Sequence, residues 1–138
     1  MKILNLKTYK LKLLHTKDQY NYLVDTCFTF TCAYNDSVLT TFDHQPYNRI
    51  ELHHILYYGL RERYSTLNAD YINTCISMSY ETYKSQSKLK NCKTIPQSKF
   101  TSPRLTKHLY TLNLNSTTVS ICTTNGRQTI PFKCRKDI

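Results

Sequence analysis

The chain of 138 residues contains no tryptophan and only two glycines, Gly59 and Gly126. A loop that cradles phosphate groups needs clustered glycines, so two isolated ones exclude such a loop. The chain also has no apolar run near the about 20 residues that a membrane-spanning helix requires. Lys7, Lys10 and Lys12 interrupt the first segment, which therefore lacks the apolar centre of a secretory signal peptide. We expect a cytoplasmic protein without a membrane partner.

Metal-binding patterns are also missing. The six cysteines include no C-x-x-C pair, and His53 and His54 are adjacent rather than at the i, i+4 spacing of zinc-binding helices. The acidic residues are scattered singly, so paired carboxylates for nuclease chemistry are not evident. We therefore predict no metal, no cofactor and no catalytic residue. We interpret the cysteines as reduced, small and mostly buried apolar side chains, with a disulfide framework as the alternative.

Acidic residues are rare at both ends of a chain whose formal net charge is +10, with Asp137 as the one exception. Residues 1–17 contain five lysines, residues 82–136 contain eleven basic residues, and neither range contains an acidic one. The range 18–81 holds eight acidic residues and three arginines. If the basic ends lie together, they make one positive face that favours nucleic acid. The alternative is an ordinary solvated surface.

The first half of the chain predicts one strand followed by helices. Alternation over 3–14 indicates a strand with a wet, lysine-bearing face. Thr16 and Gln19 form a capping box that starts a helix over about 17–38, followed by a loop at 40–47. A weaker capping signal at Asn48 predicts a helix to about Tyr64, and a third helix covers about 68–86. The last two should pack antiparallel.

The second half predicts a basic connector and a hairpin. Residues 87–104 carry two prolines and no periodicity, and 105–115 could form a strand. Alternation over 117–123 places Val119 and Ile121 on one face. Asn125-Gly126 is a strong two-residue hairpin signal, for which we expect positive φ at both residues. The return strand over 128–132 should turn Ile130 and Phe132 inward, and its Pro131 suggests a sheet edge.

These elements predict one α+β module over 1–138. The sheet part comprises 1–14 and 105–138, and 15–104 is a helical insertion with the basic connector. The middle predicted helix is rich in tyrosine and arginine. Tyrosine rings can stack on bases, and guanidinium groups can bind phosphates. The alternative is that one tyrosine packs inward and the arginines pair with Glu51 or Glu62. The predicted nucleic-acid-binding residues are Lys7, Lys10, Lys12, Tyr57, Tyr58, Arg61, Arg63, Lys84, Lys88, Lys90, Lys93, Arg104 and Arg127.

Three blocks of the sequence resemble the N-terminal half of TnpB (OrfB-type) transposon proteins. KTYKLKLLHTKDQ is similar to their K-x-L-K-L-x-P-T-x-x-Q, although His15 replaces the usual proline. LHHILYYGLRERYSTLNADYINTCISMSYETYKS resembles the next block of one TnpB branch, and VSICTTNGRQTIPF resembles V-S-I-x-T-x-x-G-R-x-x-I-P-F. The Y-D-x-R expected after Phe100 is missing.

The resemblance implies an RNA-guided DNA nuclease of bacterial insertion sequences. The N-terminal part of that family is a wedge-like β-barrel interrupted by a helical insertion, which holds guide RNA and helps to read DNA. Cleavage belongs to a RuvC-like domain downstream, and we expect this chain to stop before it. The first hypothesis is therefore a non-catalytic module that binds guide RNA and DNA. The alternatives are a structural or regulatory module that binds a protein partner, a decayed transposase remnant without activity, and, least favoured, a complete small enzyme.

Overall fold

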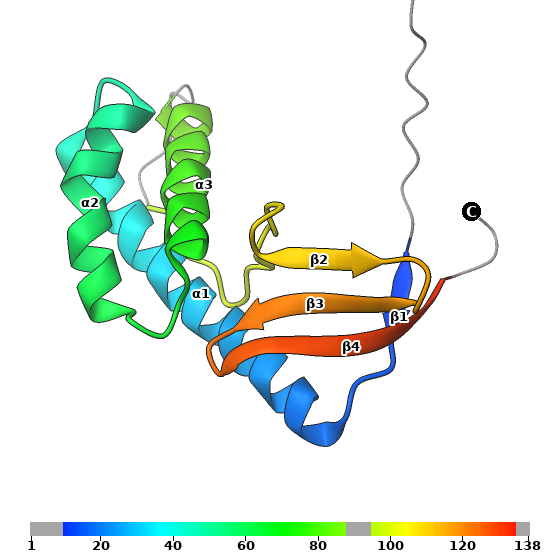
Figure 1. The fold of residues 1–138 in the computed structure, drawn as a ribbon. Coiled ribbons are helices and arrows are strands. Elements are labelled where there is room, and N and C mark those ends of the chain that lie inside the picture. Colours follow the sequence, from blue (N-terminus) through cyan, green and yellow to red (C-terminus); the bar gives the residue numbers. More distant parts are fainter. Residues whose placement is uncertain (1–9, 88–94, 135–138) are drawn as a thin grey trace, which may run out of the picture.

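The computed structural model describes residues 10–87 and 95–134, which form a three-helix layer beside a four-stranded sheet (Figure 1). The predicted α+β class is therefore confirmed. The part of the predicted first strand before Lys10 lies outside the described residues. The elements are β1 (Leu11–Leu13), α1 (Lys17–His44), α2 (Arg49–Arg63), α3 (Ala69–Ser87), β2 (Tyr110–Asn113), β3 (Thr118–Thr123) and β4 (Gly126–Cys134).

Helix α1 begins at the predicted capping box. The Gln19 N–H donates to Thr16 Oγ1 at 3.1 Å, and the Thr16 N–H donates to Gln19 Oε1 at 3.0 Å. The helix continues to His44, so the predicted loop over 40–47 is wrong at residues 40–44. Thr41 is fully buried in this last turn and Phe42 packs edge-on against Tyr83 of α3, which holds the chain helical up to the turn before Pro46.

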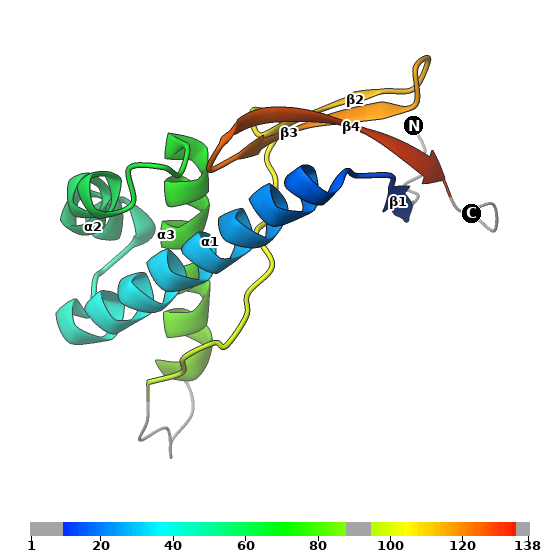
Figure 2. The same ribbon diagram turned by 90° about the horizontal axis from the view of Figure 1, so that it is seen from below.

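The helical core lies where α3 packs against both α1 and α2. Helices α2 and α3 lie side by side in Figure 1, but Figure 2 shows α2 nearly end-on beside α3 seen along its length. The two helices therefore cross at a steep angle instead of running antiparallel as the sequence suggested. Leu52, Leu56 and Leu60 form the buried stripe of α2, at the spacing that keeps one helix face inward. Phe30 of α1 and Ile76 of α3 are fully buried in the same core.

The four strands are all antiparallel, in the order β1-β4-β3-β2. The helices are therefore an insertion between two strands of one sheet, as predicted. No pairing joins the edge strands β1 and β2 in the described part of the chain, so the sheet is open there and the expected barrel is not closed. Val119, Ile121, Ile130 and Phe132 point to the buried face, as their alternation predicts. The strand predicted over 105–115 is confined to the four residues of β2.

Pro131 corrects one prediction about the sheet. It lies in β4, which is an inner strand, whereas the sequence suggested an edge. The Leu14 N–H donates to the Pro131 carbonyl at 2.8 Å, but proline has no N–H to complete the pair. Pro131 is tolerated because the missing donor falls where the pairing of β1 with β4 ends.

The β3–β4 hairpin turns at the predicted place with a different geometry. Thr124 and Asn125 form its two-residue loop, and Thr123 pairs with Gly126. Only Gly126 has a positive φ, 85°, in place of the two that the Asn-Gly pair led us to expect. The Thr123 hydroxyl stabilises the turn by donating to the Gly126 carbonyl at 2.6 Å and accepting from the Asn125 N–H at 3.1 Å.

The segment before β2, residues 95–109, contains the described part of the connector and runs beside α1 (Figure 2). Asn35 holds it by a reciprocal pair of hydrogen bonds with the Ser98 main chain, both of 2.9 Å. Thr31 binds the Thr101 N–H in the same way at 3.0 Å. Leu109, at the end of this segment, is fully buried in the helical core. The connector therefore lacks secondary structure because its main chain bonds to side chains of α1.

We expect Ile76→Ala to lower the free energy of unfolding by about 2–5 kcal/mol, because it leaves a cavity in the helical core. The matched control is Ile50→Ala, since Ile50 is 64% exposed and its truncation should change stability by less than about 0.5 kcal/mol. Urea denaturation followed by circular dichroism measures both. Equal losses for the two variants would contradict this placement of the core.

Candidate nucleic-acid interface

Charge is segregated between the two halves of the fold. Helices α1, α2 and α3 contain eight acidic and five basic residues. The described residues outside the helices contain seven basic residues and no acidic one. Of these seven, Arg104 forms an ion pair with Glu81, and no ion pair is found for the other six within the described ranges. The net positive charge of the described residues is therefore concentrated on the sheet and on the segments next to it.

Two lysines lie opposite each other on the outer face of the sheet. Lys12 of β1 pairs in register with Lys133 of β4, and both side chains are exposed. Their strand neighbours Leu11, Leu13 and Phe132 point to the other face, since side chains alternate along a strand. Directly opposite side chains have Cβ atoms about 4.5–5.5 Å apart, so the two ammonium groups repel each other. An anion lying between them would relieve that repulsion.

Arg127 lies on the same outer face, towards the hairpin end of β4. Its guanidinium donates to the Ser120 hydroxyl at 3.0 Å and to the His108 carbonyl at 3.1 Å. It also lies 3.4 Å from the Thr111 hydroxyl, so it connects β4 to β3 and β2. Arg127 thus has a structural role, while its side chain stays exposed to solvent.

The four predicted contacts on α2 do not act as one group. Tyr57 is half-buried against the helical core and stacks on His53 with ring centres 4.7 Å apart. Tyr58 is 77% exposed, so its ring is accessible for stacking on a base. Arg61 is exposed, and its Nη1 lies 3.5 Å from the Leu67 carbonyl. Figures 1 and 2 show α2 and the β1–β4 edge at opposite ends of the molecule.

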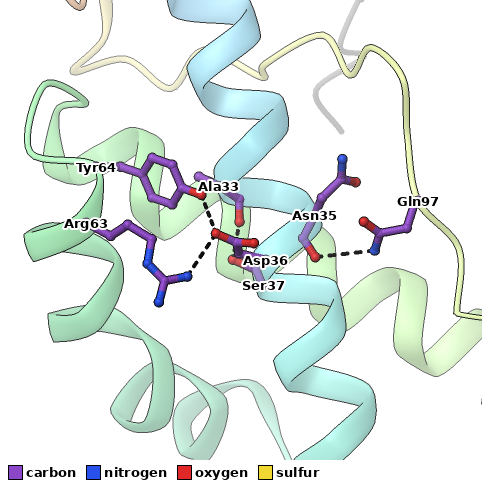
Figure 3. A network of polar contacts seen from close by, with 7 residues as sticks. All are labelled: Ala33, Asn35, Asp36, Ser37, Arg63, Tyr64 and Gln97. Carbon is purple, nitrogen blue, oxygen red and sulfur yellow. Dashed lines mark hydrogen bonds and ion pairs between the residues drawn. The ribbon is translucent and has the colours of Figure 1, made fainter.

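Asp36 engages the last arginine of α2 (Figure 3). Arg63 Nη1 donates to Asp36 Oδ2 at 3.0 Å, and the Tyr64 hydroxyl donates to the same oxygen. Arg63 therefore pairs with a carboxylate of α1, which the sequence did not indicate, rather than with Glu51 or Glu62. Burial, and then the hydrogen bond to Asp36, raise the pKa of the Tyr64 hydroxyl.

Arg61 and Arg127 line a single cleft, although 65 positions separate them in sequence. The cleft has a volume of about 490 Å³ and lies between the α2–α3 turn and the β3–β4 hairpin. The rest of its lining combines hydroxyl and amide side chains, among them Ser65, Thr66 and Asn68, with apolar groups such as Leu67 and Ala69. No carboxylate is among its lining residues.

The remaining predicted residues are dispersed. Lys10 is exposed next to β1, and Lys84 is exposed on α3. Arg104 is engaged by Glu81 at 2.8 Å. The sequence prediction missed Lys133, which the alternation of Ile130 and Phe132 along β4 could have placed on the outer face. Four predicted contacts lie outside the described residues, namely Lys7, Lys88, Lys90 and Lys93.

The cysteines and acidic residues do not gather into a metal site within residues 10–87 and 95–134. Cys27, Cys32, Cys75 and Cys122 are free thiols, of which Cys75 is fully buried and the other three are half-buried. Burial raises the pKa of the Cys75 and Cys27 thiols. None of the helices in the described ranges is long and apolar enough to cross a membrane.

Comparisons with protein-family models, with curated proteins and with solved structures found no match to this chain. Its function is therefore inferred from its own residues and geometry.

We expect Asp36→Asn to lower the pKa of Tyr64, because the negative charge that opposes formation of the tyrosinate is removed. Titration of the tyrosine ring resonances by NMR measures the change. Asp43→Asn is the control, since Asp43 is exposed on the same helix. An unchanged Tyr64 titration in the Asp36 variant would show that burial alone sets this pKa.

Proposed function

We propose that the protein binds the phosphate backbone of nucleic acid along the outer face of its sheet. The observation that carries the proposal is the exposed pair of Lys12 and Lys133, held opposite each other by strand register with no carboxylate on their strands. Placing like charges opposite each other costs stability unless an anion compensates them. A phosphate backbone supplies such anions at regular spacing.

The rest of the outer face suits the same ligand. Arg127 lies six residues before Lys133 on β4, which is about 20 Å along an extended strand. Thr129 and Ser120 pair across β4 and β3 on this face, and hydroxyl groups commonly donate to phosphate oxygens. Contacts of this kind set affinity without choosing a sequence. We therefore propose binding that depends on the backbone, with base recognition left to exposed rings such as Tyr58.

The resemblance of three sequence blocks to TnpB proteins supports RNA as the ligand, with DNA bound beside it. We propose a binding role without catalysis, because the acidic residues are scattered singly along the sequence. The acidic helices would repel a polyanion and orient it towards the sheet.

We expect the purified chain to bind structured RNA with an affinity that falls steeply between about 50 and 200 mM salt. Replacing both Lys12 and Lys133 by Gln should weaken binding and reduce the slope of log K against log salt by about two. Fluorescence anisotropy with labelled RNA, single-stranded DNA and duplex DNA measures both quantities and ranks the three ligands.

The matched control is the double variant Arg49→Gln with Arg63→Gln, which removes the same net charge from the acidic helical half. Its slope should stay within about half a unit of that of the parent chain, because Arg63 is already paired with Asp36. Equal losses for the two double variants would mean that net charge alone drives binding. Absence of binding at the lowest salt would refute the proposal.

A second candidate function rests on a different surface. Apolar side chains on the inner face of the sheet, including Tyr110, Leu112 and Leu114 at its β2 end, line an open trough of about 850 Å³. Within the described ranges β2 pairs only with β3, so its outer edge is free to accept a strand. The partner would be an extended protein segment with apolar side chains at alternate positions, which would lie over the trough.

This candidate predicts binding that persists or strengthens at high salt, because apolar burial rather than charge supplies the free energy. A synthetic peptide of alternating valine and threonine is a suitable probe, and calorimetry measures its affinity. Leu112→Glu should abolish peptide binding and leave RNA binding unchanged. Peptide binding that falls with salt as RNA binding does would rule this candidate out.

A further inference from the structure

The cleft between the α2–α3 turn and the β3–β4 hairpin brings together two arginines that the sequence separates. Arg61 enters it from the last turn of α2, and Arg127 from the first residues of β4. Both figures of the whole chain show the two turns near each other (Figures 1 and 2). Two guanidinium groups that approach one space from two sides suit a tetrahedral oxyanion. Arg61 can offer two parallel N–H donors, whereas Arg127, whose Nη1 and Nη2 also donate to Ser120 and to the His108 carbonyl, adds its positive charge and its remaining N–H groups.

The other lining groups are neutral and include hydrogen-bond donors. Ser65 and Thr66 are exposed at the α2–α3 turn, and no hydrogen bond of either hydroxyl is recorded in the described part of the chain. The main chain of Gly126 borders the cleft on the opposite side, and its lack of a side chain keeps that side open. Donors from side chains and an open backbone approach are features of phosphate sites in proteins.

The carboxylates of Asp25 and Asp70 do not line the cleft. Asp25 accepts a hydrogen bond from the Thr124 hydroxyl and does not line the cleft. Asp70, in the first turn of α3, lines a different depression together with Arg104. Arg61 has one long contact, 3.5 Å, to the Leu67 carbonyl. That contact leaves most of its donors available to a ligand.

We infer that this cleft binds a phosphate group, with Arg61 and Arg127 as the two gripping side chains. The identification of that phosphate as part of a nucleic-acid backbone rests on the function proposed above. Arg127 joins the two surfaces, because its side chain belongs both to the outer face of the sheet and to the cleft. A backbone that follows β4 from Lys133 towards the hairpin would therefore reach Arg61 next.

The test uses the whole chain and variants at the accessible side of the cleft. Arg61→Gln should weaken RNA binding about three- to tenfold, as expected for loss of one hydrogen-bonded contact, and should reduce the salt slope by about one. Arg61→Lys should recover the slope but not the full affinity, because lysine keeps the charge and loses the paired donors. Ser65→Glu, which places a carboxylate at the rim, should weaken binding at least as much as Arg61→Gln.

Arg49→Gln is the control, because Arg49 lies at the start of the same helix and outside the cleft. Thermal unfolding of every variant checks that the fold is kept. Arg127→Gln is not used alone, because its hydrogen bonds to β2 and β3 would be lost as well.

A second measurement separates the cleft from the proposed function. Inorganic phosphate and pyrophosphate are titrated into the chain while the arginine side-chain resonances are followed by NMR. Saturable shifts of the Arg61 signal, lost in Ser65→Glu, support the cleft even if the chain binds no RNA, and would then indicate a small phosphorylated ligand. RNA binding that is equal in the parent and in Arg61→Gln, together with no phosphate-dependent shift, would overturn the inference and leave the outer-face proposal standing.

Discussion

The relation between helices and sheet depends on side chains that bind the main chain of one hairpin. The hydroxyl of Tyr71, which is almost fully buried in α3, donates to the Cys122 carbonyl at 2.6 Å. Thr26 of α1 accepts from the Thr124 N–H at 2.9 Å, and Gln19 donates to the Thr129 carbonyl at 3.0 Å. Hydrogen bonds are directional, so these three contacts, two of them partly buried, fix the hairpin against both helices. They thereby set the gap between the α2–α3 turn and the start of β4.

The distribution of charge makes the helical half of the molecule more negative than the sheet. Acidic residues gather on the helices, and the described cationic residues outside them lie on the connector and on the sheet. A molecule with such a dipole would turn in the field of a polyanion before contact and present its sheet first. Asp36 and Glu81 also neutralise Arg63 and Arg104, which removes two predicted contacts from the free positive surface.

The sequence predicted the start of a helix or the course of a strand where residues close together in the chain determine it. The capping box at Thr16, the capping residue Asn48 and the alternation around Val119 located α1, α2 and β3 because each acts within a few residues. The overrun of α1 to His44 was missed because the burial of its last turn depends on α3.

The path of the connector and the residues of the candidate site could not be predicted from the sequence alone. The connector has no periodicity, since its hydrogen bonds go to Asn35 and Thr31, more than 60 positions away. Individual cationic residues were predicted from composition, but the pairing of Lys12 with Lys133 required the strand order. The meeting of Arg61 with Arg127 required the packing of a hairpin against a helical turn.

The pairing of Leu11 with Cys134 brings the two limits of the sheet side by side. Two points separated by most of the described chain are thus neighbours, at the end of β4 away from the hairpin. A fold with this property can be spliced into a surface loop of another protein without stretching either junction. It can equally be anchored to a solid support through that end, with the arginine-lined cleft facing outward into solution.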